Sequence, residues 1–188
     1  MKINNNTIIK DSDPLIRESS FPVDIPLSKE DTILMESLIL YVKNSRIEEI
    51  AEAENLRPAV GISAIQVGVK KQMCVIIIDD VDKNNNDIHI EYALVNPKII
   101  SKSVQKAYLK GGEGCLSVEN QHEGLVNRHA RIKVSAYDYF QKKQITFKAQ
   151  NYLAIVLQHE FDHFSGRLFY DYINEENPFE HDQDAIEI

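Results

Sequence analysis

The first quarter of the chain contains an amphipathic pattern that is typical of helices. Apolar side chains recur three and four positions apart in one stretch, at Ile33, Leu34, Leu38, Tyr41 and Val42. Ser28 precedes them in a loose, acidic form of the capping box, so we expect a helix to begin there. A second helical piece is expected over residues 46–55. A short helical turn is expected over 11–19, where Asp13 caps a turn that begins at Pro14.

From residue 72 onward the pattern changes to that of strands. Residues 72–80 form an almost continuous apolar run, which favours an interior strand. After the polar stretch 82–87, residues 88–95 can return beside it as a hairpin with a long tip. Residues 131–139 alternate between apolar and polar, and 144–149 can pair with them in a second hairpin.

Residues 151–164 return to a helical pattern that is apolar nearly all round in its first half, as expected of a buried helix. Gly166 is well placed to end it. The order of helices, strands and one buried helix predicts an α+β fold, with antiparallel strands packed around a central buried helix. We expect residues 1–188 to form a single domain, because this length suits one hydrophobic core.

Composition narrows the classes of function. The chain has 188 residues and a formal net charge of -8, which argues against non-specific binding to nucleic acid or to anionic membranes. No apolar stretch approaches the ~20 residues of a membrane span, and the first residues do not form a signal peptide. The two cysteines, Cys74 and Cys115, do not indicate a disulfide framework. We therefore expect a cytoplasmic protein with reduced thiols.

The predicted buried helix carries a His-Glu-x-x-His sequence at His159, Glu160 and His163. At about 100° per residue the two histidines point in nearly the same direction, one turn apart, so both can bind one divalent metal ion. Glu160 is rotated from them and can reach a water at the metal without ligating it. The alternative is a chance match with two surface histidines. The apolar turn before the motif favours a functional site, because buried polar groups need partners.

A catalytic metal needs a third protein ligand and one open position. The downstream candidates are Asp171, Glu175, Glu176, Glu180 and His181, and none has a spacing that singles it out. Upstream, Cys115 lies in the sequence Gly-Gly-Glu-Gly-Cys-Leu-Ser at 111–117, where glycines let the backbone approach a ligand closely. Its thiolate suits zinc or iron, so we expect Cys115 to be the third ligand. A simple glycine-rich turn is the alternative interpretation of this segment.

A third segment, residues 59–66, has the sequence Ala-Val-Gly-Ile-Ser-Ala-Ile-Gln. Its small residues permit close backbone approach. The side-chain amide of Gln66 can donate a hydrogen bond to a developing oxyanion. Taken alone this signal is weak, because a polar residue at the end of a loop is commonplace.

In this order the three segments resemble the motifs of the peptide deformylase family, which are Gly-x-Gly-Leu-Ala-Ala-x-Gln, Glu-Gly-Cys-Leu-Ser and Gln-His-Glu-x-Asp-His. Residues 113–117 match the second motif and 158–163 the third. The first is matched with departures, among them Ala59 in place of glycine and Ser63 in place of alanine. The resemblance extends over nearly the whole chain. The helical insert before the first motif is similar to that of the type 2 branch found in Gram-positive bacteria.

The resemblance implies a metal-dependent hydrolase that removes the N-formyl group from the formyl-methionine of newly made bacterial polypeptides. It implies one divalent ion per chain, Fe(II) as the native metal, and nickel, cobalt or zinc as substitutes. Glu160 would transfer protons, and Gln66 and the backbone N–H of Leu116 would meet the oxyanion. The substrate would lie against residues in or beside the motifs, at Val60, Gly61, Gly111, Gly112, Glu113, Ile155 and Val156. An enzyme that acts on this substrate can lie transiently near the ribosome. We expect no direct binding to nucleic acid.

Three rival interpretations stay open at this point. A peptidase with the same helix motif would take its third ligand from downstream. A degenerate family member would bind formylated termini or metal without turnover, although such proteins usually lose a site residue. A structural zinc module would need four protein ligands, and the sequence offers three. The departures at Ala59 and Ser63 predict altered detail rather than lost activity.

Overall fold

Three α-helices and four short 3-10 helices occur in the computed structural model, which describes residues 1–81 and 86–188. The α-helices are α1 (Lys29–Ser45), α2 (Glu48–Glu54) and α3 (Asn151–Asp162). The 3-10 helices are η1 (Pro14–Arg17), η2 (Ala64–Val67), η3 (His163–Ser165) and η4 (Phe169–Tyr172). Among the described residues, none of the helices combines the length and the apolar character needed to cross a bilayer.

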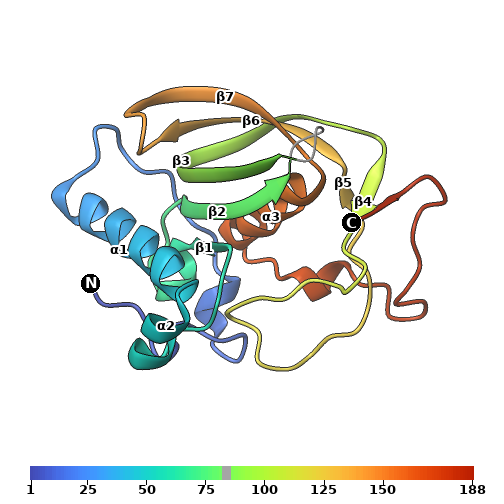
Figure 1. Cartoon of the computed structure of the whole chain (residues 1–188), viewed down its shortest axis with the longest axis horizontal. Helices are drawn as coiled ribbons and strands as arrows, with labels where there is room; N and C mark the ends of the chain where they lie inside the picture. The colour runs from blue at the N-terminus through green and yellow to red at the C-terminus, as the bar shows by residue number, and fades with distance from the viewer. Residues whose placement is uncertain (82–85) are drawn as a thin grey trace.

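Two β-sheets accompany the helices (Figure 1). The larger sheet has the strand order β1-β2-β3-β6-β7, and all its neighbouring strands are antiparallel. Its strands are β1 (Gly61–Ser63), β2 (Met73–Val81), β3 (Asp87–Lys102), β6 (Arg131–Asp138) and β7 (Lys143–Gln150). The smaller sheet joins β5 (Arg128–His129), β4 (Lys106–Tyr108) and β8 (Ile186–Glu187), with β4 and β8 parallel. The predicted α+β class, with a mainly antiparallel sheet and few helices, is confirmed.

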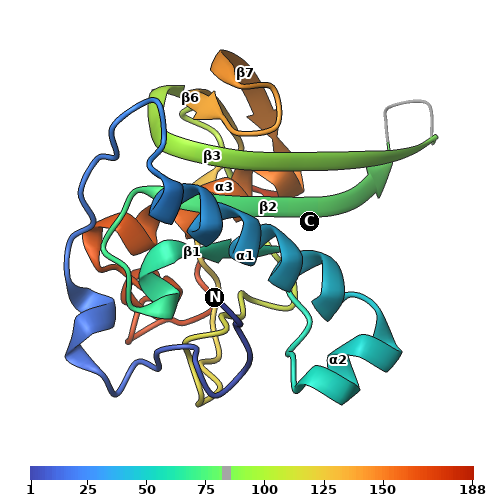
Figure 2. The ribbon, with the colours of Figure 1, turned by 90° about the vertical axis from the view of Figure 1, so that its left-hand side faces the viewer.

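The larger sheet is covered by α1 on one face and by α3 on the other (Figures 1 and 2). Met73, Val75 and Ile77 of β2 belong to the core beneath α1, and Cys74, Ile76 and Ile78 to the core beneath α3. Successive side chains of a strand point to opposite faces of the sheet. Because helices cover both faces, every residue of β2 from Met73 to Ile78 is buried. The unbroken apolar run in the sequence is the consequence.

Helix α3 packs against the larger sheet and carries His159 and Glu160, the first two residues of the His-Glu-x-x-His motif. Its side chains from Leu153 to Leu157 are buried. The helix ends at Asp162, two residues before the predicted end, so His163 begins η3 instead of lying on α3. The backbone of His163 stays in the right-handed helical region at φ -56 and ψ -29, which keeps it one turn from His159. Gly166 then ends the segment in the left-handed conformation, as predicted.

Two predicted N-terminal caps are confirmed. Asp13 accepts a hydrogen bond from the backbone N–H of Leu15 at 2.9 Å at the start of η1. Ser28 accepts one from the backbone N–H of Asp31 at 3.1 Å at the start of α1. Each cap satisfies a backbone donor that the first helical turn leaves without a partner. Helix α2 begins at Glu48, two residues later than the pattern predicted.

The two predicted hairpins are present as β2–β3 and β6–β7. β3 is longer than predicted and continues past residue 95 to Lys102. A register shift between Val95 and Lys98 accommodates Pro97, whose nitrogen cannot donate to a neighbouring strand. Residues 82–85 of the predicted hairpin tip lie outside the described residues. Sequence patterns do not predict the strands of the smaller sheet, because two or three residues show no periodicity.

Replacing Gly166 by alanine is expected to lower the free energy of unfolding by more than about 2 kcal/mol, since a left-handed L-residue alone costs about 1–2 kcal/mol. The φ of Gly166 is 68, and an added Cβ would lie 1.9 Å from the carbonyl oxygen of Arg17. Urea unfolding measures the difference from the wild type. Gly111→Ala is the matched control, because an added Cβ there meets no atom within 4 Å. Equal losses in both variants would contradict this account.

Candidate metal centre

Three side chains from separate segments meet at one point. His159 comes from α3, His163 from the start of η3, and Cys115 from the loop between β4 and β5. One ligand atom of each lies within 4.8 Å of the others. Sγ of Cys115 is 3.5 Å from Nε2 of His163. In the described part of the chain, neither the downstream acidic residues nor His181 join this cluster.

The spacing suits a single tetrahedral metal ion. Metal–sulfur distances of about 2.3 Å and metal–nitrogen distances of about 2.0–2.1 Å, at a tetrahedral angle, place the two donors about 3.5 Å apart. Cys115 and His163 have this separation. Burial, reinforced by the charge of His159, lowers the pKa of His163 well below its usual range, so the neutral ring can offer a lone pair. One thiolate and two imidazoles suit ions such as zinc or iron.

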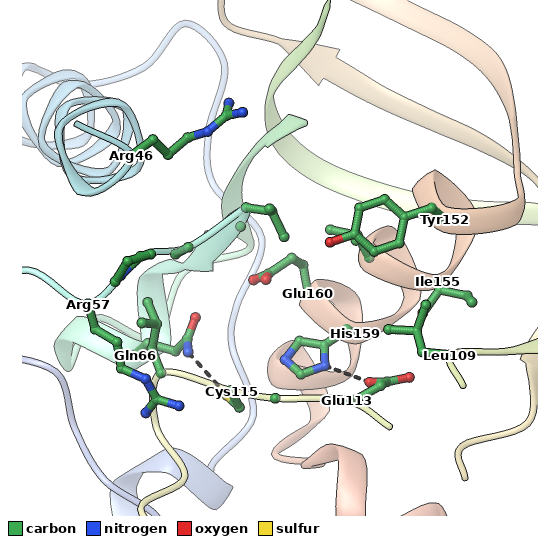
Figure 3. A pocket seen from close by; sticks show the side chains of 17 residues that line it. Arg46, Arg57, Gln66, Leu109, Glu113, Cys115, Tyr152, Ile155, His159 and Glu160 are labelled. Atoms are coloured by element: carbon green, nitrogen blue, oxygen red, sulfur yellow. Dashed lines mark hydrogen bonds and ion pairs between the residues drawn. The ribbon is translucent and has the colours of Figure 1, made fainter. Parts of the chain in front are cut away.

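Glu113 and Arg128 fix the orientation of His159. The Glu113 carboxylate accepts a hydrogen bond from Nδ1 of His159 at 2.8 Å, so the other ring nitrogen faces the side of Cys115 (Figure 3). Arg128 donates from Nε and Nη2 to the two Glu113 oxygens at 2.7 and 2.9 Å. Burial alone would raise the pKa of Glu113, but these hydrogen bonds outweigh it and hold the pKa at about 2. Glu113 is therefore a permanent anion at neutral pH.

Arg128 lies between two carboxylates and has a side chain only 5% exposed. It pairs with Asp162 as well as with Glu113, and Asp162 also accepts the Tyr172 hydroxyl at 2.8 Å. Arg128 belongs to no recognisable motif, so the sequence does not identify it. The available signal is indirect: Glu113 and Asp162 stand close to the candidate metal ligands in the sequence, and a carboxylate with little exposure needs a cation.

The Glu160 carboxylate lines the same pocket as Cys115 and His159, in a residue only 4% exposed. Its Oε2 accepts a hydrogen bond from Oγ of Ser63 at 2.7 Å. Its Oε1 lies against Gly61, where an added Cβ would come within 2.5 Å of it. Burial raises the pKa of Glu160, although the charge of His159 and the Ser63 hydroxyl act in the opposite direction. A carboxyl group with a raised pKa takes up a proton more readily than an ordinary carboxyl group, as a proton carrier must.

Gln66 is buried next to Cys115. Its Oε1 accepts the backbone N–H of Ser63 at 2.8 Å, which fixes the orientation of the amide. Its Nε2 donates to Oγ of Ser117 at 3.2 Å and lies 3.5 Å from Sγ of Cys115. The backbone N–H of Leu116 has no acceptor among the residues that the structure describes. One side-chain donor and one backbone donor are thus found beside the cysteine.

A cleft of about 510 Å³ opens beside these groups (Figure 3). The predicted site residues that line it are Val60, Gly61, Gln66, Glu113, Cys115, Leu116, Ile155, Val156, His159 and Glu160. Arg46, Arg57 and Tyr152 also line it, which their sequence context does not indicate. Gly111 and Gly112 instead line a neighbouring cavity that shares Glu113 and Cys115 with the cleft. His163 is buried and is not part of the cleft lining.

Comparison with known proteins identifies the family. The sequence model described as Polypeptide deformylase matches residues 5–179. The chain belongs to the polypeptide deformylase family. It is 45% identical to the peptide deformylase of Oceanobacillus iheyensis, over 92% of this chain and 91% of that protein. It is 41% identical to peptide deformylase 2 of Bacillus subtilis, over 99% of this chain and 98% of that protein.

A solved structure of the family has the same fold. The crystal structure of the class I type b peptide deformylase of Acinetobacter baumannii, with Met-Ala-Ser bound, is 25% identical to this chain. The TM-score is 0.67, and the match covers 88% of this chain and 96% of that chain. The resemblance inferred from three sequence motifs is thereby confirmed at the level of the family.

Both departures from the family motif are compatible with the site. Ala59 is not among the residues with positive φ, so its backbone accepts a methyl group. Ser63 is fully buried, and its hydroxyl finds an acceptor on Glu160. The second departure therefore introduces a contact with a predicted catalytic side chain.

Replacing Glu113 by glutamine is expected to change how the stability of the metal-free protein depends on pH. Folding lowers the pKa of Glu113 from 4.5 to about 2, which corresponds to about 3 kcal/mol. This stabilisation is present above pH 4.5 and is lost as the pH falls towards 2. The variant should therefore be less stable than the wild type at pH 7, and the difference should shrink on acidification.

Urea unfolding of chelator-treated protein at pH 7 and pH 3 measures this difference in free energy. The exposed Glu123→Gln is the matched control, and it should unfold like the wild type at both pH values. The free energy of unfolding of Glu113→Gln and of the wild type could instead differ by the same amount at both pH values. That result would show that the ionised Glu113 carboxylate does not cause the loss of stability.

Proposed function

We propose that this chain removes the N-formyl group from the formyl-methionine that begins newly made bacterial polypeptides. As a peptide deformylase it hydrolyses the bond between the formyl carbon and the methionine nitrogen, and it releases formate and a free amine. The observation that carries the proposal is the convergence of Cys115, His159 and His163 beside the buried carboxylate of Glu160. The Acinetobacter baumannii relative was crystallised with Met-Ala-Ser, a peptide of the kind that this reaction releases.

Cys115, His159 and His163 are proposed to hold one divalent ion, natively Fe(II), with nickel, cobalt or zinc as substitutes. When bound, such an ion supplies the positive charge that polarises a carbonyl and makes water a better nucleophile. The donor set supports a metal of this group and does not itself select one. Glu113 holds the proton of His159 on Nδ1, which leaves the other nitrogen free as a ligand.

Glu160 is proposed to move the protons. Its carboxylate accepts a proton from the attacking water and delivers it to the methionine nitrogen as the carbon–nitrogen bond breaks. Its burial and its raised pKa support both roles. Helix α3 is the central catalytic element in this proposal, because it carries Glu160 next to His159 and packs its apolar side against the larger sheet.

Gln66 and Leu116 are proposed to stabilise the negative charge that develops on the formyl oxygen. Nε2 of Gln66 lies 3.5 Å from the Cys115 sulfur, a long contact that a substrate oxygen can replace. The backbone N–H of Leu116 is available, since it has no acceptor within the described residues. Each donor of this kind contributes a factor of about 10²–10³ to the rate.

The peptide is proposed to bind in extended form along Val60 and Gly61. β1 lies at the edge of the larger sheet and is paired with β2 alone among the described strands, so its other edge can accept a strand. Ile155 and Val156 line the cleft with apolar surface for the methionine side chain. Glu113, Gly111 and Gly112 lie nearby, on the cleft and on the cavity next to it.

The setting of the reaction follows from the substrate. We propose one catalytic domain over residues 1–188 that acts in the cytoplasm on chains near the ribosome. The net charge of -8 supports action on the peptide without direct binding to nucleic acid.

Glu160→Ala is expected to lower formate release from formyl-Met-Ala-Ser by a factor of at least about 10²–10⁴, because it removes the proton carrier. The wild type should release formate from this peptide and should hardly hydrolyse acetyl-Met-Ala-Ser. The methyl of the acetyl group would have to fit beside the buried side chains that are proposed to bind the metal, where the formyl group has only a hydrogen. Formate is measured with a coupled dehydrogenase on anaerobically purified protein. Metal content by mass spectrometry should remain one ion per chain in the variant.

Cleavage of an internal peptide bond at a rate equal to formyl release would overturn this function in favour of a peptidase. Full activity of Glu160→Ala would overturn the role of Glu160 as proton carrier. The proposed metal ligands would not be tested by that result.

A further inference from the structure

Ser63 contacts both side chains that are proposed to act on the substrate without binding the metal. Its backbone N–H donates to Oε1 of Gln66 at 2.8 Å. Its hydroxyl lies 2.7 Å from Oε2 of Glu160 and 2.9 Å from the backbone oxygen of the same residue. Ser63 is fully buried at the end of β1, so bulk water does not compete for its hydroxyl.

The Glu160 carboxylate has few other restraints. Among the described residues, Ser63 is the one side chain that hydrogen-bonds to it. On its other side lies Gly61, where an added Cβ would come 2.5 Å from Oε1 and 2.9 Å from the carboxyl carbon. Gly61 therefore leaves room for the carboxylate and provides no group that orients it.

The two carboxylate oxygens are in different surroundings. Oε2 is held by Ser63. Oε1 accepts no hydrogen bond from the described residues and is not among the enclosed polar atoms without a partner, so it is the oxygen open to the cleft. An oxygen in this position can exchange protons with a water and with the leaving nitrogen.

From this geometry we propose that Ser63 is a positioning residue, whose hydroxyl holds Oε2 of Glu160 and thereby directs Oε1 into the cleft. The inference rests on the proposed deformylase function, in which Glu160 carries the protons. A serine hydroxyl bonded to a carboxylate is a strong, directional contact. The family motif that the chain resembles has alanine here, so this chain adds a restraint through the departure itself.

Ser63→Ala tests this role by removing both contacts of the hydroxyl with Glu160. The substitution removes one hydroxyl and keeps the backbone N–H that orients Gln66. We expect kcat for formyl-Met-Ala-Ser to fall about 10-fold, because small misplacements of a catalytic group are costly, and KM to stay within about twofold. In a Glu160→Ala background the same substitution should change kcat by less than about twofold, because the group that it positions is gone.

Two further measurements separate positioning from a general loss of packing. Ser37→Ala is the matched control, since its buried hydroxyl donates to the backbone oxygen of Ile33 at 2.7 Å on α1, and this variant should keep wild-type kcat. A crystal structure of Ser63→Ala should show the Glu160 carboxylate displaced or in more than one position.

Unchanged kcat in Ser63→Ala, with Glu160 in its wild-type position, would overturn the positioning role while deformylase activity of the wild type stands. An equal fall of kcat in the Glu160→Ala background would overturn it as well. If the wild type releases no formate, the proposed function fails. The position of Glu160 in crystals of Ser63→Ala then still decides whether the hydroxyl fixes the carboxylate.

Discussion

A thiolate and two imidazoles can share one ion only if their donor atoms are held a few ångströms apart. Here the two histidines are fixed by one turn of helix, and α3 is fixed by the apolar side chains that it buries against the larger sheet. The third donor comes from a distant loop. That loop brings Cys115 to the cluster and, two residues earlier, Glu113 to Nδ1 of His159. The path of one loop therefore positions one candidate ligand and orients another.

Charge balance around the cluster depends on the smaller sheet. Arg128 lies on β5, which pairs with β4, and this places its guanidinium between Glu113 and Asp162. The result is two carboxylates with opposite pKa shifts close to the same candidate ligands. Glu113 has a pKa of about 2 because Arg128 and His159 outweigh its burial, whereas burial raises the pKa of Glu160. One is a permanent anion and the other a group that can carry a proton.

The sequence predicts the features whose signal is local. Helical periodicity and capping residues identify α1 and η1, and apolar runs and alternation identify β2 and β6. The spacing of His159 and His163 within a helix predicts that they meet. Features that depend on the path of a loop are not predicted: the partners of Arg128, the contact of Ser63 with Glu160, and the location of Gly111 outside the cleft. Short strands such as β8 are not predicted either, because two residues show no periodicity in the sequence.

The ligand set is tested most directly by X-ray absorption spectroscopy of the purified protein loaded with one ion per chain. The account predicts a first shell with one sulfur at about 2.3 Å and two imidazole nitrogens at about 2.0–2.1 Å. Cys115→Asp should lose the sulfur contribution and keep both imidazoles. A first shell of nitrogen and oxygen alone in the wild type would contradict the claim that Cys115, His159 and His163 together hold the metal.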